Sequence, residues 1–247
     1  MKAWILSLFL IFSAQASAWT VSGSGMQGWQ AKTLTVNYNF TDCSLTSAEL
    51  LSQLATTLAV WNASQNSGLH LVLAGSPSSD TLAQVAARTA TTPLIICDDD
   101  FTAGQGADGN AIPALTQVAT AGGAVAFAAM ILNSEIGKSA EISQLSSGEL
   151  SVTITHEFGH ALGLGHTQDV NALMYYSIAG KQTAVLSQDD MAGVAFLYPR
   201  NELTGGAFGC ARAGTPSPTP IHGLLLAAVS LLGAFALGRW VRSARPL

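Results

Sequence analysis

Hydrophobic and polar positions in the first part of the chain predict a strand followed by a helix. Residues 33–40 alternate with a period of two and are apolar at the even positions, which is typical of a half-buried strand. Thr46 and Glu49 have the spacing of a capping box, so we expect a helix from there to about Asn62. Apolar residues recur along it at helical spacing and form the predicted buried stripe. They are Leu50, Leu51, Leu54, Leu58 and Trp61.

Further strands are predicted at 69–73, 93–97 and 123–132, the last with a weaker signal because it is rich in alanine. His70 falls in the first of these, and we interpret it as a half-buried strand residue rather than a metal ligand. Ser146 and Glu149 form a second capping box and predict a helix that extends through residue 160. A final helix is predicted before Pro199. A mixed sheet followed by these helices indicates an α+β fold.

Residues 156–166 read HEFGHALGLGH, and three of the chain's five histidines fall within them. On a helix, His156 and His160 project from the same face, so both imidazoles can reach one metal ion. Catalytic zinc usually takes three protein ligands, which makes His166 the expected third ligand. An alternative is a polar helix face that carries two unrelated histidines.

For His166 to join the other two histidines, the chain must turn back after the helix. Gly163 and Gly165 would allow this turn, because glycine adopts left-handed conformations at little cost. Glu157 lies next to the first ligand and is expected to act as general base toward a zinc-activated water.

The motif resembles that of metzincin metalloproteases, and of the matrixin-like branch in particular. Thr167 follows the third histidine, and Met174 lies in a quartet that resembles the Met-turn beneath the zinc of that family. Residues 186–198 resemble the closing helix of matrixins. The resemblance implies a twisted mixed sheet with an active-site helix, a Met-turn and a C-terminal helix. It also implies a zinc-dependent endopeptidase whose protein or peptide substrate binds as an added strand along residues 126–131.

Tyr176 departs from the matrixin pattern, which has proline at this position. It resembles the tyrosine of astacin-like and serralysin-like branches, which stabilises the reacting oxyanion; a wall of the substrate pocket is the simpler interpretation. A non-catalytic surface binding module on a metzincin scaffold is the alternative function. The presence of Glu157 argues against that alternative.

The two ends of the chain indicate export. Residues 1–18 have the charged start, apolar core and small-residue end of a signal peptide, which leaves 19–205 as the catalytic domain. A Gly/Pro-rich linker at 206–220 contains Cys210, interpreted as a processing or lipidation site. Residues 221–238 form a hydrophobic segment long enough for a transmembrane or sorting helix, and 239–247 a basic cytoplasmic tail. We therefore expect a secreted or envelope-anchored protein.

The charge of the predicted domain bears on its binding partners, and its cysteines bear on its covalent links. All fifteen acidic residues lie within 19–205, against five basic ones, so a nucleic-acid partner is not expected. Cys43 and Cys97 are candidates for a disulfide, with two buried thiols as the alternative. The acidic, Gly-containing loop 98–110 is interpreted as solvated, with calcium binding as an alternative.

Overall fold

A computed structural model describes residues 19–23 and 26–200. The predicted signal peptide, the linker with Cys210, the hydrophobic segment 221–238 and the basic tail lie outside the described residues. Among those described, no helix combines the length and the apolar character needed to cross a membrane.

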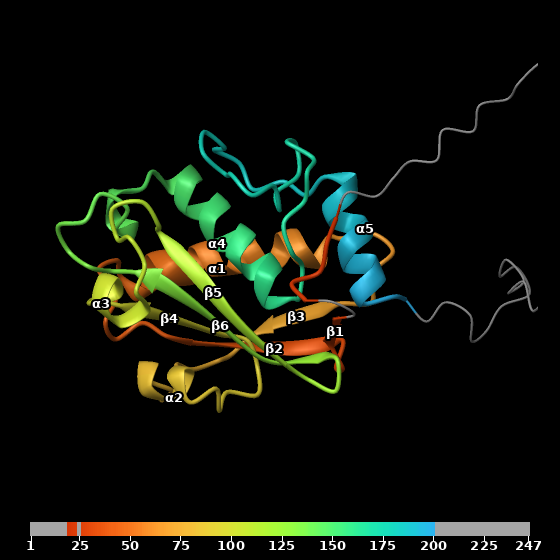
Figure 1. The fold of residues 1–247 in the computed structure, drawn as a ribbon, viewed down its shortest axis with the longest axis horizontal. Coiled ribbons are helices and arrows are strands. Elements are labelled where there is room, and N and C mark those ends of the chain that lie inside the picture. Colours follow the sequence, from red (N-terminus) through yellow and green to blue (C-terminus); the bar gives the residue numbers. More distant parts are fainter. Residues whose placement is uncertain (1–18, 24–25, 201–247) are drawn as a thin grey trace, which may run out of the picture. The chain divides into compact units, whose positions relative to one another are not determined.

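The chain forms a six-stranded sheet that is parallel apart from one pairing (Figure 1). Its strands are β1 (Gln27–Trp29), β2 (Thr33–Asn39), β3 (His70–Leu73), β4 (Leu94–Asp98), β5 (Ala114–Ala121) and β6 (Ala124–Asn133). The order is β1-β6-β4-β2-β3, and β5 pairs with β6 in antiparallel orientation. The mixed sheet and α+β fold predicted from the sequence are therefore confirmed.

Strand β6 is an inner strand, which corrects one expectation. It pairs with β5 along one side, and with β1 and then β4 along the other. Residues 126–131 therefore have no free edge to which a substrate strand could add. The side of β5 that faces away from β6 has no partner strand in the described sheet and provides that edge instead.

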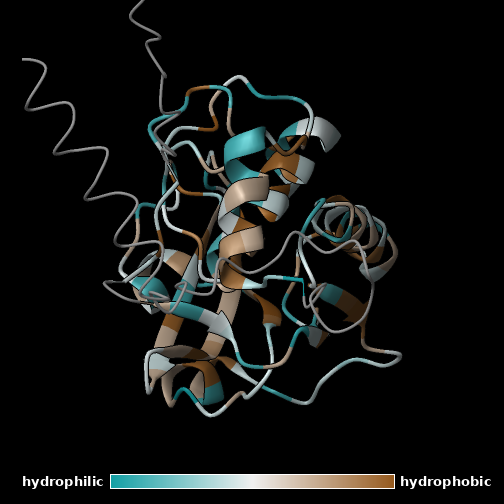
Figure 2. Cartoon of the chain, turned by 90° about the vertical axis from the view of Figure 1, so that its right-hand side faces the viewer, coloured by the Kyte–Doolittle hydropathy of each residue, from teal (hydrophilic) through white to brown (hydrophobic). Residues whose placement is uncertain are grey.

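Both faces of β6 are covered, as expected for a strand in the middle of such a sheet. Phe127, Ala129 and Ile131 pack on one face with side chains from α2 (Leu82–Ala86) and α3 (Phe101–Gln105). Met130 and Leu132 belong to the larger core on the other face, beneath α1 (Ser47–Asn62) and α4 (Ser147–Ala161). Figure 2 shows hydrophobic segments on strands and helices alike, and Figure 1 shows α1 and α4 side by side over the sheet.

The capping residues predicted from the sequence start both long helices. Thr46 and Ser146 are the N-caps of α1 and α4, and each exchanges hydrogen bonds with the glutamate three residues later. Trp61 joins the two helices, because its Nε1 donates to the Thr155 carbonyl at 3.0 Å. A short 3-10 helix, Ile142–Gln144, precedes α4, and α5 (Gln188–Leu197) closes the fold before Pro199. Helix α4 is thus fixed at both its start and its inner face.

Two further expectations concern His70 and the cysteines. His70 lies in a strand, as predicted, but it is exposed rather than half-buried, because its side chain points away from the core in which Leu69 and Leu71 are buried. A disulfide joins Cys43 to Cys97 at the end of β4, with a Cα–Cα distance of 5.1 Å. It ties the segment before α1 to the centre of the sheet.

Candidate active site

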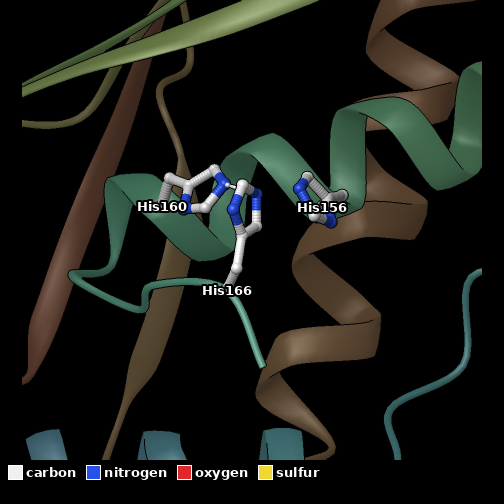
Figure 3. Close-up of side chains that lie close together, drawn as sticks. All are labelled: His156, His160 and His166. Atoms are coloured by element: carbon white, nitrogen blue, oxygen red, sulfur yellow. Dashed lines mark hydrogen bonds between the residues drawn. The ribbon is translucent and has the colours of Figure 1, made fainter. Parts of the chain in front are cut away.

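Three histidines converge at the C-terminal end of α4. His156 and His160 project from the helix, and His166 comes from the loop that follows it (Figure 3). One ligand nitrogen from each lies within 4.8 Å of the others, and the Nε2 atoms of His160 and His166 are 3.2 Å apart. Among the described residues, this is the only group of three or more His, Cys, Asp or Glu side chains close enough to hold a metal ion.

Backbone carbonyls set the orientation of the two helical histidines. The Nδ1 of His156 lies 2.7 Å from the Leu173 carbonyl oxygen, and that of His160 lies 2.8 Å from the Leu164 oxygen. A carbonyl can only accept, so Nδ1 carries the proton in each ring and Nε2 keeps its lone pair. This arrangement, in which a carbonyl fixes the tautomer of a metal-binding imidazole, is common in metal sites.

The electrostatics of the site also suit a cation. Burial lowers the pKa of His156 and His160 to about 4, which keeps both rings neutral at pH 7. Two nitrogens bound to one tetrahedral zinc are about 3.4 Å apart. The 3.2 Å between His160 and His166 is close to that value, so the donor set fits zinc.

The turn after α4 uses its two glycines for different reasons. Gly163 has a φ of 104°, a left-handed conformation that favours glycine. Gly165 has no such φ, but a Cβ there would overlap the hydroxyl of Thr20. The expectation that both glycines supply unusual backbone angles is therefore right for Gly163 and wrong for Gly165, which allows a close approach of the N-terminal segment.

Residues 19–22 run beside the loop that contains His166. Thr20 Oγ1 donates to the carbonyl of His166 at 2.6 Å, and Ser22 Oγ donates to that of Leu164 at 2.7 Å. The backbone N–H of Trp19 donates to Asp189 of α5 at 3.0 Å. The N-terminal segment therefore holds the loop of the third histidine in place.

A tight turn, residues 172–175, passes beneath the histidines, and the Tyr175 N–H donates to the Ala172 carbonyl at 3.2 Å. Met174 in this turn is 2% exposed and packs so closely on Gly159 that a Cβ there would overlap its sulfur. Asp190 accepts hydrogen bonds from the N–H groups of Leu173 and Met174 at 2.8 and 3.0 Å. Helix α5 thereby fixes the turn.

Glu157 is half-buried between α4 and β5. Burial raises the pKa of its carboxyl to about 7, although a hydrogen bond from the Thr116 hydroxyl acts in the opposite direction. A carboxyl with a pKa near the working pH is suited to accept and then release a proton.

The remaining candidate residues are Tyr176, which lines a separate cavity, and those of the acidic loop. Tyr176 is 67% exposed and lines a cavity of about 330 Å³ between α4 and residues 176–181. In the acidic loop, the carboxylate of Asp98 is occupied by hydrogen bonds from Asp100 and Gln105. These bonds explain the burial of Asp98 without a calcium ion.

Sequence reasoning did not find Thr116, Thr20 or Ser22, and it included Asp190 only as part of the closing helix expected at residues 186–198. No local pattern marks the first three, because their partners lie far away in the chain. The capping box formed by Ser187 and Asp190 was a usable signal for the start of α5.

Comparison with known proteins agrees with this geometry. The Matrixin family profile matches residues 97–199, which run from the end of β4 through α5 and include all three histidines. Human matrilysin is 52% identical over 46 residues, 18% of this chain and 17% of that protein. Metalloendoproteinase 1 of Glycine max is 46% identical over 57 residues, 23% of this chain and 19% of its own length. Human neutrophil collagenase is 45% identical over 51 residues, 20% of this chain and 11% of its own.

The aligned part is thus less than a fifth of each of these relatives. Within it, the chain is similar to matrixins, as the motif indicated, and the similarity supports a metallopeptidase in general.

Proposed function

We propose that this matrixin-like protein is a zinc-dependent endopeptidase that cleaves proteins or peptides outside the cytoplasm. The observation that carries the proposal is the convergence of three imidazoles on one point beside a half-buried carboxyl group. His156, His160 and His166 would hold the metal. Bound zinc would supply a Lewis acid that polarises the scissile carbonyl and lowers the pKa of a water molecule.

Glu157 is the proposed general base. It takes the proton of the water that attacks the peptide carbonyl and delivers it to the leaving amine. Its carboxyl group is poised for both steps, since burial brings its pKa to about 7. The carbonyls of Leu173 and Leu164 keep the two helical imidazoles in the tautomer that a metal requires.

The free edge of β5 is the proposed binding site for the substrate backbone. An extended peptide can add to such an edge through main-chain hydrogen bonds, which recognise the backbone more than the side chains. Thr116 and Val118 of β5 line a cleft of about 490 Å³ together with His160 and His166. A peptide on this edge would therefore pass the histidines.

The cavity beside Tyr176 is the proposed pocket for one substrate side chain. Its wall includes Val152, Leu145 and Ile178, which favours an apolar side chain next to the cleaved bond. In this arrangement Tyr176 is a pocket-wall residue, and its 67% exposure supports that role over oxyanion stabilisation.

Export and anchoring complete the proposal. Residues 1–18 direct export, 19–205 form the catalytic domain, and 221–238 with the basic tail anchor or sort the protein. Cys210 in the linker 206–220 is the proposed processing site. The disulfide between Cys43 and Cys97 suits an oxidising compartment.

The test is cleavage of a peptide library by the purified exported protein, with and without a chelator. We expect cleavage that the chelator abolishes and that added zinc restores. Stoichiometric zinc without any cleavage would favour the non-catalytic binding module.

A further inference from the structure

Thr116 of β5 is hydrogen-bonded to the proposed general base, Glu157. Its hydroxyl oxygen lies 2.8 Å from Glu157 Oε2 and 2.9 Å from the Glu157 backbone carbonyl oxygen. Among the described residues, no other side chain is hydrogen-bonded to this carboxyl group. The orientation of the Glu157 side chain therefore depends on Thr116.

A hydroxyl group suits this position because it both donates and accepts. Its one proton can be donated to Glu157 Oε2 or to the Glu157 backbone carbonyl oxygen, both of which lie within hydrogen-bond distance. The same hydroxyl therefore holds the Glu157 side chain against its own backbone and against β5.

Thr116 is also part of the proposed substrate edge. It is paired with Met130 of β6 on one side, and it lines the cleft next to His160 on the other. The pairing with β6 fixes the strand independently of the hydroxyl group. Removing that group should therefore leave the sheet in place.

We propose that Thr116 is a positioning residue that aligns Glu157 with a substrate bound along β5. This inference rests on the proposed function. It adds that the strand which binds the substrate backbone also orients the group that moves the proton. Seating of the substrate and alignment of the base are then coupled through one hydroxyl.

The experiment compares the full exported protein with Thr116→Val, Thr116→Ser and the control Thr56→Val. Valine keeps the shape of threonine without the hydroxyl, and Thr56 is an exposed residue of α1, outside the proposed substrate edge. For Thr116→Val we expect kcat to fall about tenfold, with KM within about twofold, as for the loss of an outer hydrogen bond in a metal site. Serine and the control should stay within about threefold of wild type in kcat.

Two measurements do not depend on activity. Zinc content should be unchanged in all variants, and crystal structures of the zinc-loaded proteins should show the Glu157 carboxylate displaced by about 1 Å in Thr116→Val but not in Thr116→Ser. If Thr116→Val does not fold, Thr116→Ala replaces it. An undisplaced carboxylate in Thr116→Val, or a kcat equal to that of an active wild type, would overturn the inference.

The two proposals fail in different ways. If the wild type cleaves no peptide, the proposed function is wrong, and the carboxylate positions alone decide whether Thr116 orients Glu157. If the wild type is active and Thr116→Val matches it in kcat, only the role of Thr116 is wrong.

Discussion

Asp190 accepts a hydrogen bond from the backbone N–H of Leu173 at 2.8 Å, and the carbonyl of the same Leu173 is bound by the imidazole of His156 at 2.7 Å. One residue of the tight turn therefore connects helix α5 to a candidate metal ligand. Asp190 is 1% exposed, so its carboxylate is shielded from water and depends on these backbone donors.

Asp190→Ala should weaken both the fold and the metal site. Each buried N–H left without a partner costs about 1–3 kcal/mol in the free energy of unfolding. We also expect faster loss of zinc to a chelator, because the carbonyl that orients His156 is no longer held. Denaturant unfolding and chelator competition measure the two effects, with the exposed Gln188→Ala as control. Wild-type zinc retention in Asp190→Ala would contradict the proposed link.

Glu157→Ala should retain zinc and lose activity. Metal binding by the three imidazoles does not require this carboxyl group. Proton transfer by a positioned side chain, in contrast, contributes about 10²–10⁴-fold to the rate. Metal analysis and peptide cleavage give the two results. Activity close to that of wild type would remove Glu157 from the mechanism.

The metal-free protein should lose stability as the pH falls from 6.5 to about 4. The pKa of His156 and His160 is lowered from 6.5 to about 4 by burial, so the unfolded chain takes up protons before the folded one does. Their contribution is complete above pH 6.5 and is lost as the pH falls through 4. Unfolding midpoints measured in chelator across this range test the expectation.

Glu157 acts in the opposite direction in the same experiment. Its pKa is raised from 4.5 to about 7, so its contribution is complete below pH 4.5 and is lost as the pH rises through 7. Glu157→Gln should therefore steepen the loss of stability between pH 6.5 and 4.5. A wild-type profile that is flat from pH 4 to 6.5 would show that the histidines are not buried as described.

The N-terminal segment should be needed for tight metal binding. Thr20→Val with Ser22→Ala removes the hydrogen bonds to the carbonyls of His166 and Leu164, each worth about 0.5–1.5 kcal/mol. We expect a lower unfolding temperature and a shorter half-life of the zinc complex in chelator. The exposed Ser52→Ala serves as control. An unchanged half-life would mean that the loop of His166 is stable without this segment.

The parts predicted from sequence are those set by local chemistry. The starts of α1 and α4 follow from side chains that bond to backbone groups three residues away, as with Ser146 and Glu149. Strand β5 was not predicted, because its sequence, ALTQVATA, mixes apolar and polar residues without a period of two. Its place follows only from pairing with β6.

The sequence itself contained evidence against residues 126–131 as the free edge that binds substrate. These residues are apolar at every position, which is typical of a strand covered on both faces rather than of a free edge. The role of Thr116 had no such signal. The contact of Thr116 with Glu157, 41 residues later, exists only in the folded structure, where the sheet places the two side chains together.

The contact between residues 19–22 and the loop of His166 has a consequence for the order in which parts of the domain fold. Thr20 and His166 are 146 positions apart, and Trp19 and Asp189 are 170 apart. Contacts between such distant segments form late, because the chain must first lose the entropy of closing a large loop. A chain that lacks α5 cannot complete this arrangement. We therefore expect zinc capture to be among the last events of folding, so that the proposed exported peptidase would begin to cleave only after its whole domain has left the cytoplasm.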